Sequence, residues 1–171
     1  VESCGLGPWP QGYVHCGGIP TEIVEVTSFA GKVWMDRNLG ARKVASHTNL
    51  QDSDAFGDLY QWGRFADGHQ CRTSKVTGTK SSTTRPAHGD FIAYAPRTIW
   101  EDDWLATRNN NLWQGVNGVN NPCPEGFRVP TIAEWTAEVN AWRGGSTPYD
   151  QVMPPDPMKL AVNAGGRFSD Y

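Results

Sequence analysis

The feature that most constrains the fold is residues 121–135, where a proline-punctuated approach leads into a helix start. Thr131 is a good N-cap residue, and Glu134 stands three positions later, where its carboxylate reaches back to the amide of the cap. Gly144 and Gly145 predict the C-terminal end of this helix. The pattern predicts a capped helix from Thr131 to Gly144. Apolar residues spaced for one helical face are Ile132, Trp135, Val139 and Trp142.

The composition indicates a loop-rich α+β protein. The chain of 171 residues is long enough for one core, and its 8 tryptophans, 19 glycines and 12 prolines favour aromatic packing beneath irregular backbone. The net charge of -3 gives no general attraction to nucleic acid or acidic membranes, and no apolar run spans a bilayer. We expect a Cys- and Pro-rich leader at residues 1–20 and one domain at residues 21–171.

Four cysteines, an even number, favour an oxidising compartment and therefore disulfides. Cys4 and Cys16 flank a Gly/Pro-rich stretch and could cross-link the leader locally. Cys71 and Cys123 would then pair across roughly 50 residues, a closure worth about 4 kcal/mol in the chain-entropy model. Three connectivities are possible and the sequence does not choose between them. Four reduced cysteines in a cytosolic protein are the alternative.

The first half of the chain predicts two strands and a further helix. Residues 22–27 and 32–37 have strand character and flank a turn at residues 28–31. A helix is predicted to begin near Ser53 and to run through Trp62 and Gly63, with early carboxylates that suit a positive helix N-terminus. Residues 68–90 are rich in Ser and Thr and contain no acid before Asp90. This composition predicts a solvated, mobile loop rather than a binding patch.

Three motifs in this order resemble the Fibrobacter succinogenes major paralogous domain, a bacterial and phage branch of the C-type lectin-like fold. They are Trp-Met-Asp-Arg-Asn-Leu-Gly-Ala at 34–41, Gly-Asp-Leu-Tyr-Gln-Trp-Gly-Arg at 57–64, and residues 123–135. The resemblance implies a small twisted antiparallel sheet with two flanking helices and long irregular loops. It also places Trp34, Trp62 and Trp135 in the core. Residues 128–135 and 143–145 are more distantly similar to the formylglycine-generating enzyme family.

One departure from that family concerns the C-terminus. Family members continue past residues 165–168 into further core strands and a terminal cysteine, whereas this sequence stops at Tyr171. We therefore expect the usual C-terminal strands to be missing, either because the sequence is part of a longer protein or because another chain supplies them. Without the terminal cysteine, Cys123 also lacks its family partner.

Signatures of catalysis are absent from the sequence. None of the histidines has zinc-ligand spacing, and all stand in polar, loop-like contexts: His15, His47, His69 and His88. For His69 beside Cys71 we expect a solvated histidine and a structural cysteine rather than a metal site. The chemistry of formylglycine-generating enzymes needs reactive cysteines in the distal half, and no cysteine follows Cys123. We therefore expect no enzyme.

Calcium is the nearest cofactor alternative. Asp52, Asp54 and Asp58 crowd one short segment, but Phe56 and Gly63 stand where an EF-hand loop needs ligands. Helix N-terminal capping is the favoured role of these carboxylates. The sugar-binding motifs of calcium-dependent C-type lectins are absent as well. We expect no cofactor, with calcium as the alternative.

A binding surface remains as the candidate site. Residues 91–121 form a long stretch without periodicity, which is usually functional or disordered. Its tryptophans and asparagines combine flat apolar faces with amide donors and acceptors, which suits sugar rings or protein hot spots. In the alternative, the tryptophans anchor the loop to the core and the asparagines shape turns. The candidate ligand-binding residues are Trp100, Trp104, Asn109, Asn110, Asn111, Trp113 and Asn117.

The expected function is therefore recognition. We expect a non-enzymatic module on the outside of a cell or virion that displays loops for adhesion, with a cell-surface glycan or protein receptor as its partner. The resemblance supports this expectation, because such relatives are mostly secreted or surface-displayed. The alternative is a structural or decorating subunit of a filament, appendage or capsid, completed by neighbouring chains. An enzyme of the formylglycine-generating type ranks third. Nucleic acid and membrane insertion are not expected.

Overall fold

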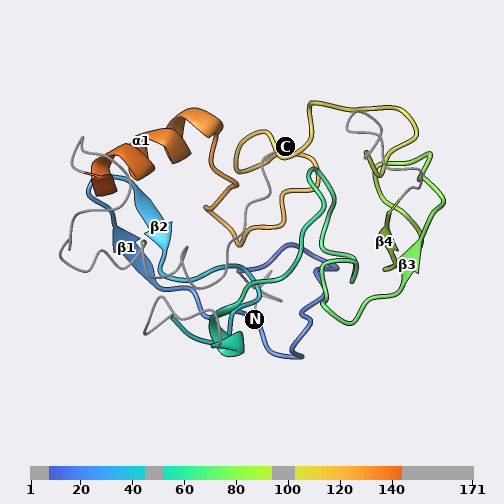
Figure 1. The fold of residues 1–171 in the computed structure, drawn as a ribbon, viewed down its shortest axis with the longest axis horizontal. Coiled ribbons are helices and arrows are strands. Elements are labelled where there is room, and N and C mark those ends of the chain that lie inside the picture. The colour runs from blue at the N-terminus through green and yellow to red at the C-terminus, as the bar shows by residue number, and fades with distance from the viewer. Residues whose placement is uncertain (1–7, 45–51, 94–102, 144–171) are drawn as a thin grey trace, which may run out of the picture. The chain divides into compact units, whose positions relative to one another are not determined.

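The computed structural model describes residues 8–44, 52–93 and 103–143. The chain divides into two compact units. The loop unit comprises residues 1–19 and 58–129, and the helical unit comprises residues 20–57 and 130–171. The elements, in chain order, are β1 (Glu25–Thr27), β2 (Val33–Met35), the 3-10 turn η1 (Ser53–Ala55), β3 (Val76–Thr77), β4 (Phe91–Ile92) and α1 (Ile132–Arg143) (Figure 1). The protein is thus a small α+β structure with mostly irregular backbone.

The helical unit contains the predicted hairpin. β1 and β2 pair antiparallel, with Val26 opposite Trp34 at the centre of the register. The turn is closed by the Ser28 amide, which donates to the Lys32 carbonyl at 2.9 Å, and by Gly31, whose φ of 75° suits a residue without a Cβ. The strand prediction is confirmed in position and direction, although each paired strand is three residues long.

The helix α1 begins with the predicted capping box. The Glu134 amide donates to Thr131 Oγ1 at 3.2 Å, and the Thr131 amide donates to Glu134 Oε2 at 3.0 Å. This reciprocal pair satisfies two backbone donors that a helix start otherwise leaves open. The predicted start of the helix is therefore confirmed, and the predicted stop at Gly144 and Gly145 lies outside the described residues.

The buried face of α1 differs from the predicted apolar stripe. Ile132 is 87% exposed, whereas Glu138 is completely buried. Glu138 Oε1 accepts hydrogen bonds from Ser28 Oγ at 2.5 Å and from Trp34 Nε1 at 3.0 Å. Trp135 is half-buried and meets Trp34 edge to face, with ring centroids 6.2 Å apart. A carboxylate occupies this face because the half-buried indole and the buried hydroxyl of the hairpin need an acceptor.

The predicted helix over residues 53–63 is wrong, so the described residues contain one α-helix rather than two. Only η1 forms, and the chain is extended at Phe56. A Cβ on Gly57 would lie 2.7 Å from both Asn38 Cβ and the Leu39 carbonyl oxygen. This close backbone approach is available only to glycine and replaces the helical packing that the sequence pattern suggested. Gly63, with a φ of 77°, turns the chain again.

The sheet of the loop unit corrects the expectation of an all-antiparallel arrangement. β3 and β4 pair parallel, with Val76 opposite Phe91 and Thr77 opposite Ile92. A buried cluster forms beside them from Ile92, Trp104, Leu105 and Leu112.

The described helices are too short or too polar to traverse a bilayer.

The segment 68–90, predicted as a solvated loop, is exposed at many positions but is also held in place at several points. It contains β3, and the guanidinium of Arg85 lies 4.3 Å from the centroid of the Phe65 ring. Arg85 Nε also donates to Asn120 Oδ1 at 3.1 Å. Many side chains of this segment are exposed, as predicted for a solvated loop. The contacts of Arg85 were not predicted, because a charge count does not reveal specific partners.

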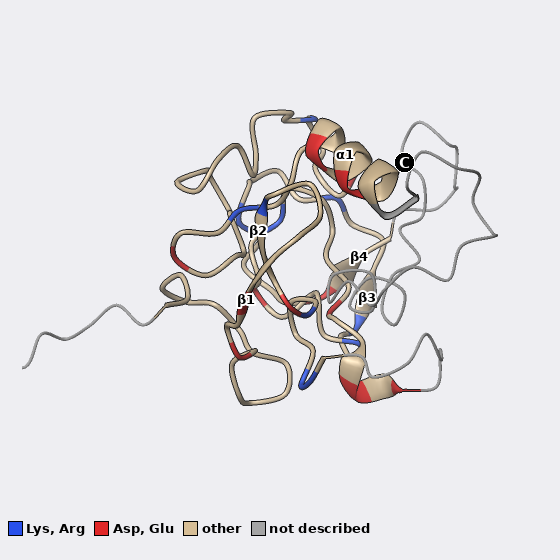
Figure 2. Cartoon of the chain, turned by 90° about the vertical axis from the view of Figure 1, so that its left-hand side faces the viewer, with Lys and Arg blue, Asp and Glu red and all other residues tan. Residues whose placement is uncertain are grey.

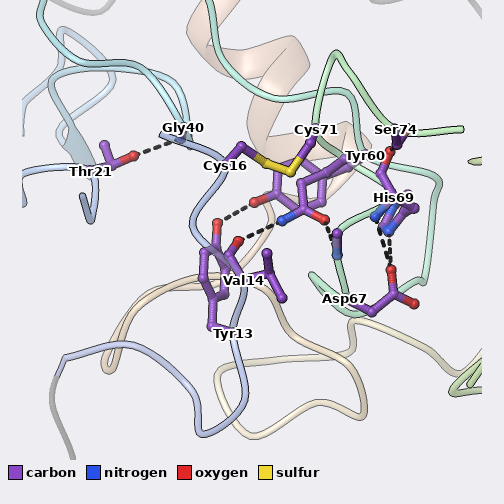
Figure 3. The surroundings of a disulfide bond; sticks show 12 residues. Tyr13, Val14, Cys16, Thr21, Gly40, Tyr60, Asp67, His69, Cys71 and Ser74 are labelled. Atoms are coloured by element: carbon purple, nitrogen blue, oxygen red, sulfur yellow. Dashed lines mark hydrogen bonds and ion pairs between the residues drawn. A yellow bond between two sulfur atoms is a disulfide. The ribbon is translucent and has the colours of Figure 1, made fainter. Parts of the chain in front are cut away.

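The disulfide joins Cys16 to Cys71, with Cα atoms 5.2 Å apart across a separation of 55 residues (Figure 3). Disulfide formation is confirmed, but the local Cys4–Cys16 and Cys71–Cys123 pairings are wrong. Cys123 is a buried free cysteine, and Cys4 lies outside the described residues. The leader reaches Cys71 because its backbone is hydrogen-bonded there: Gln70 Nε2 donates to the Val14 carbonyl at 2.7 Å.

Candidate binding surface

A buried polar network built on Arg64 supports the loop unit. The Arg64 side chain is 0% exposed, and its Nε donates to Asp67 Oδ2 at 2.9 Å. Nη1 and Nη2 donate to the carbonyls of Asp90 and His88, each at 2.9 Å. One guanidinium thereby holds the segment that leads into β4, and its Cζ lies over the Trp104 ring, 5.7 Å from the ring centroid.

His69 belongs to the same network and corrects the expectation of a solvated histidine. It is 0% exposed, and its Nδ1 lies 2.8 Å from Asp67 Oδ1 (Figure 3). Its Nε2 accepts from the Gln61 amide at 3.0 Å. The Gln61 bond identifies a neutral ring that carries its proton on Nδ1. Burial lowers the pKa of His69 and keeps the ring neutral, although the Asp67 carboxylate opposes this shift. With both nitrogens engaged, the ring has a structural role.

The metal alternatives find no support among the residues that the structure describes, where no three His, Cys, Asp or Glu side chains gather. Asp52 pairs with Lys43 at 3.1 Å, and Asp54 is exposed in η1. Asp58 is half-buried in the loop unit. His47 lies outside the described residues.

Two asparagines that are not among the candidate ligand-binding residues anchor the end of the asparagine-rich stretch. Asn120, at a φ of 61°, donates from Nδ2 to the carbonyls of Gly63 at 3.0 Å and Thr84 at 2.6 Å. Asn121 donates to Val116 at 3.0 Å, and its Oδ1 accepts from the Cys123 amide at 3.2 Å. Consecutive asparagines before a proline are the signal that could have identified this anchor, since asparagine tolerates positive φ.

Trp104, predicted as an exposed ligand platform, is a core residue. It is 3% exposed, and its Nε1 donates to the Trp62 carbonyl at 2.7 Å. The ligand prediction is wrong for this side chain because Ile92 and Leu112 enclose it in the buried cluster. Trp100 lies outside the described residues.

Trp62, rather than Trp104, is the exposed tryptophan among the described residues of the loop unit. It was predicted to be a core residue, but its side chain is 49% exposed. Its ring lies against Trp113, with centroids 6.1 Å apart, and Trp113 in turn meets Tyr60 at 6.5 Å. Trp113 is half-buried and has a φ of 60°, and its amide donates to the Val119 carbonyl at 2.9 Å. An exposed indole is therefore backed by a second, fixed indole.

The other candidate asparagines have two kinds of placement. Asn109 is half-buried, and its Oδ1 accepts from the Asn111 amide at 3.0 Å, which makes a side-chain-closed turn. The Asn110 carbonyl accepts from Gln114 Nε2 at 3.2 Å. The side chains of Asn110, Asn111 and Asn117 are exposed. Asn109 thus shapes the loop, and the other three present amides on its outside.

We define the candidate binding surface as the exposed indole together with the loop 109–119. Val116 and Val119 add exposed apolar area at 47% and 56%. Residues 109–124 contain no charged side chain. Elsewhere, Figure 2 shows basic and acidic positions scattered among many segments. The members of the candidate binding surface are Trp62, Asn110, Asn111, Trp113, Val116, Asn117 and Val119.

A second aromatic cluster joins the leader to the rest of the loop unit. Tyr13 packs on Trp9 with centroids 4.6 Å apart, and its hydroxyl is hydrogen-bonded to that of Tyr60 (Figure 3). Burial raises the pKa of both hydroxyls, so they remain protonated. Asp58 contributes to both shifts, and burial raises its own pKa to about 6 against the opposing charge of Arg72.

Comparison with known proteins yields no relative: no family model, curated protein or solved structure matches the chain. The candidate binding surface is therefore interpreted from its own geometry and chemistry.

Proposed function

We propose that this protein is a non-enzymatic recognition module that works outside the cell or on a virion and binds a glycan of a target surface. One observation carries the proposal. An indole that is 49% exposed is held against a second indole, beside a loop whose outward side chains are amides and valines. Tryptophan exposed at a fixed position favours contact with a partner, since its large apolar face gains from leaving water.

The chemistry of the surface favours an uncharged sugar. A pyranose has an apolar C–H face that matches an indole ring, and its hydroxyls match the donors and acceptors of carboxamides. The loop 109–119 offers no charged group. A sulfated or carboxylated glycan would lose hydration there without gaining an ion pair, so it is disfavoured. Neutral hexoses are the class of ligand that fits.

Three further features support a non-enzymatic, extracellular recognition module of C-type lectin-like fold. The first and third sequence motifs meet in the helical unit, where Trp34 and Trp135 pack edge to face at 6.2 Å. The Cys16–Cys71 disulfide supports an oxidising compartment. Both ring nitrogens of the buried His69 are occupied, which supports a structural rather than catalytic role for the most enclosed histidine of the described residues.

The test is a screen of neutral and acidic glycans with the wild type and Trp62→Ala. We expect binding to neutral hexose-containing glycans, and a loss of at least about tenfold in Trp62→Ala, which corresponds to about 1.4 kcal/mol. Phe29→Ala is the matched control because Phe29 is 55% exposed in the helical unit and lies outside the candidate binding surface.

Equal glycan binding by the wild type and a folded Trp62→Ala variant would refute the proposed surface. Binding confined to sulfated or sialylated glycans would refute the choice of neutral sugar. Large assemblies without glycan binding, seen by light scattering, would instead support the alternative of a structural or decorating subunit.

A further inference from the structure

The candidate binding surface carries an asparagine directly followed by a glycine, Asn117 and Gly118, and no other asparagine of the 171 residues precedes a glycine. The Asn117 side chain is exposed, and no described residue binds its carboxamide. We propose that Asn117 is a site of spontaneous deamidation, at which the side-chain amide is converted to a carboxyl group without an enzyme. The modification itself does not depend on glycan binding.

The reaction needs only these two residues and water. The backbone nitrogen of Gly118 loses its proton and attacks Cγ of Asn117. A bond from this nitrogen to Cγ forms, the bond from Cγ to Nδ2 breaks, and the side-chain nitrogen leaves with a proton as ammonia. Water then opens the resulting succinimide ring. Opening at Cγ gives aspartate, whereas opening at the backbone carbonyl carbon gives isoaspartate, in which the main chain is one carbon longer.

The packing of the loop requires glycine at position 118. A Cβ at this position would lie 2.6 Å from both the nitrogen and the carbonyl oxygen of Gln114, and neither atom belongs to a flexible side chain. The residue after Asn117 is therefore one without a Cβ, and its backbone nitrogen is not shielded from the neighbouring carboxamide. The close approach that shapes the loop thus also creates the reactive pair.

The other asparagines of the loop are held or shielded. Asn109 is half-buried, and its Oδ1 accepts from the Asn111 amide at 3.0 Å. Asn120 is 3% exposed. Asn110 and Asn111 are exposed, but each is followed by a residue with a side chain, which hinders attack by the next backbone nitrogen. We therefore expect the reaction at Asn117 and at no other asparagine of this loop.

Two hydrogen bonds of the turn oppose the reaction. The Gly118 amide donates to the Gly115 carbonyl at 3.0 Å, and this bond holds the proton that the attacking nitrogen must lose. The Val116 carbonyl accepts from Asn121 Nδ2 at 3.0 Å. The side chains of Val116 and Asn117 are nevertheless exposed, and an exposed loop opens locally at a small cost in free energy. The turn therefore slows the reaction relative to a free peptide without preventing it.

The product would change the candidate binding surface in two ways. Residues 109–124 contain no charged side chain, so a carboxylate at position 117 introduces a negative charge into a neutral loop. Isoaspartate also lengthens the main chain beside Gly118, where the backbone of Gln114 leaves no room even for a Cβ. An effect of this change on glycan binding, unlike the modification itself, rests on the proposed function.

Ageing of the wild type at mildly alkaline pH and physiological temperature tests the proposal. Trypsin releases residues 109–128 as one peptide. We expect chromatography to separate it into amide, aspartyl and isoaspartyl forms, with fragment masses that place the change on Asn117. The rate should rise with pH, because the attacking nitrogen must first be deprotonated. An unaged sample digested alongside measures any conversion that occurs during digestion.

The Asn117→Ser variant is the control and should yield no converted peptide, because it has no carboxamide at this position. A synthetic peptide of residues 109–128 should convert faster than the folded protein, since it lacks the turn. An Asn117 that stays an amide in the folded protein after the peptide has converted would overturn the proposal. Conversion at Asn110 or Asn111 ahead of Asn117 would overturn it as well.

Discussion

Replacing Asp58 by asparagine is expected to stabilise the protein near neutral pH. The carboxyl is half-buried in the loop unit, close enough to Tyr13 and Tyr60 to affect both hydroxyls. Burial raises its pKa from 3.8 to about 6, and the charge of Arg72 only partly opposes this. At neutral pH the folded protein therefore holds a carboxylate in surroundings that disfavour its charge.

The sign and size of the effect follow from the raised pKa. Because the folded pKa exceeds the unfolded value, protonated Asp58 favours the folded state below about pH 3.8, and this contribution is lost as pH rises through about 6. Raising the pKa of Asp58 by about two corresponds to a loss of at most about 3 kcal/mol in the free energy of unfolding at neutral pH. The side chain keeps substantial contact with solvent, and screening reduces the expected penalty to about 1 kcal/mol. Asp58→Asn removes this penalty.

Urea unfolding followed by tryptophan fluorescence, repeated between about pH 4 and pH 8, measures the effect. We expect Asp58→Asn to exceed the wild type by about 1 kcal/mol near pH 7 and to converge with it near pH 4. Asp54→Asn, which removes the same charge at an exposed position, should show no such convergence. A variant less stable than the wild type at pH 7, or a difference independent of pH, would refute the reasoning.

Two further substitutions test the buried network and the helix cap. Arg64→Met should lower the free energy of unfolding by about 3–5 kcal/mol, because it leaves the Asp67 carboxylate and two backbone carbonyls without their buried donor. Arg108→Ala, which removes an exposed cation, should cost under about 1 kcal/mol, and equal losses in the two variants would contradict the role of the network. Thr131→Ala should cost about 1 kcal/mol and speed amide exchange in the first turn of α1, and unchanged exchange at Glu134 would argue against the cap.

The candidate site was only partly predictable. The loop was recognisable from its length and its asparagines, and the turn at Asn109 is a local hydrogen bond that such residues commonly form. The exposed indole was not recognisable, because Trp62 and Trp104 are the same residue type and either could fill a core. Their roles depend on the position of the Leu112 and Ile92 side chains, which enclose one indole and leave the other outside.

The sequence by itself determined the elements whose stabilising contacts lie within a few residues. The Thr131–Glu134 capping box and the hairpin turn at Ser28–Lys32 are of this kind, since each closes over three or four positions. The small α+β class followed from the same local signals and from composition.

The tertiary structure alone decided the contacts that join distant segments. Glu138 became the buried residue of α1 because its acceptor meets donors from Ser28 and Trp34, over 100 positions away in the sequence. Cys16 forms its disulfide with Cys71 because the leader is hydrogen-bonded to Gln70, the residue before Cys71. A long-range partner is selected by packing and by the need of buried polar groups for hydrogen-bond partners, and both depend on the fold of distant segments.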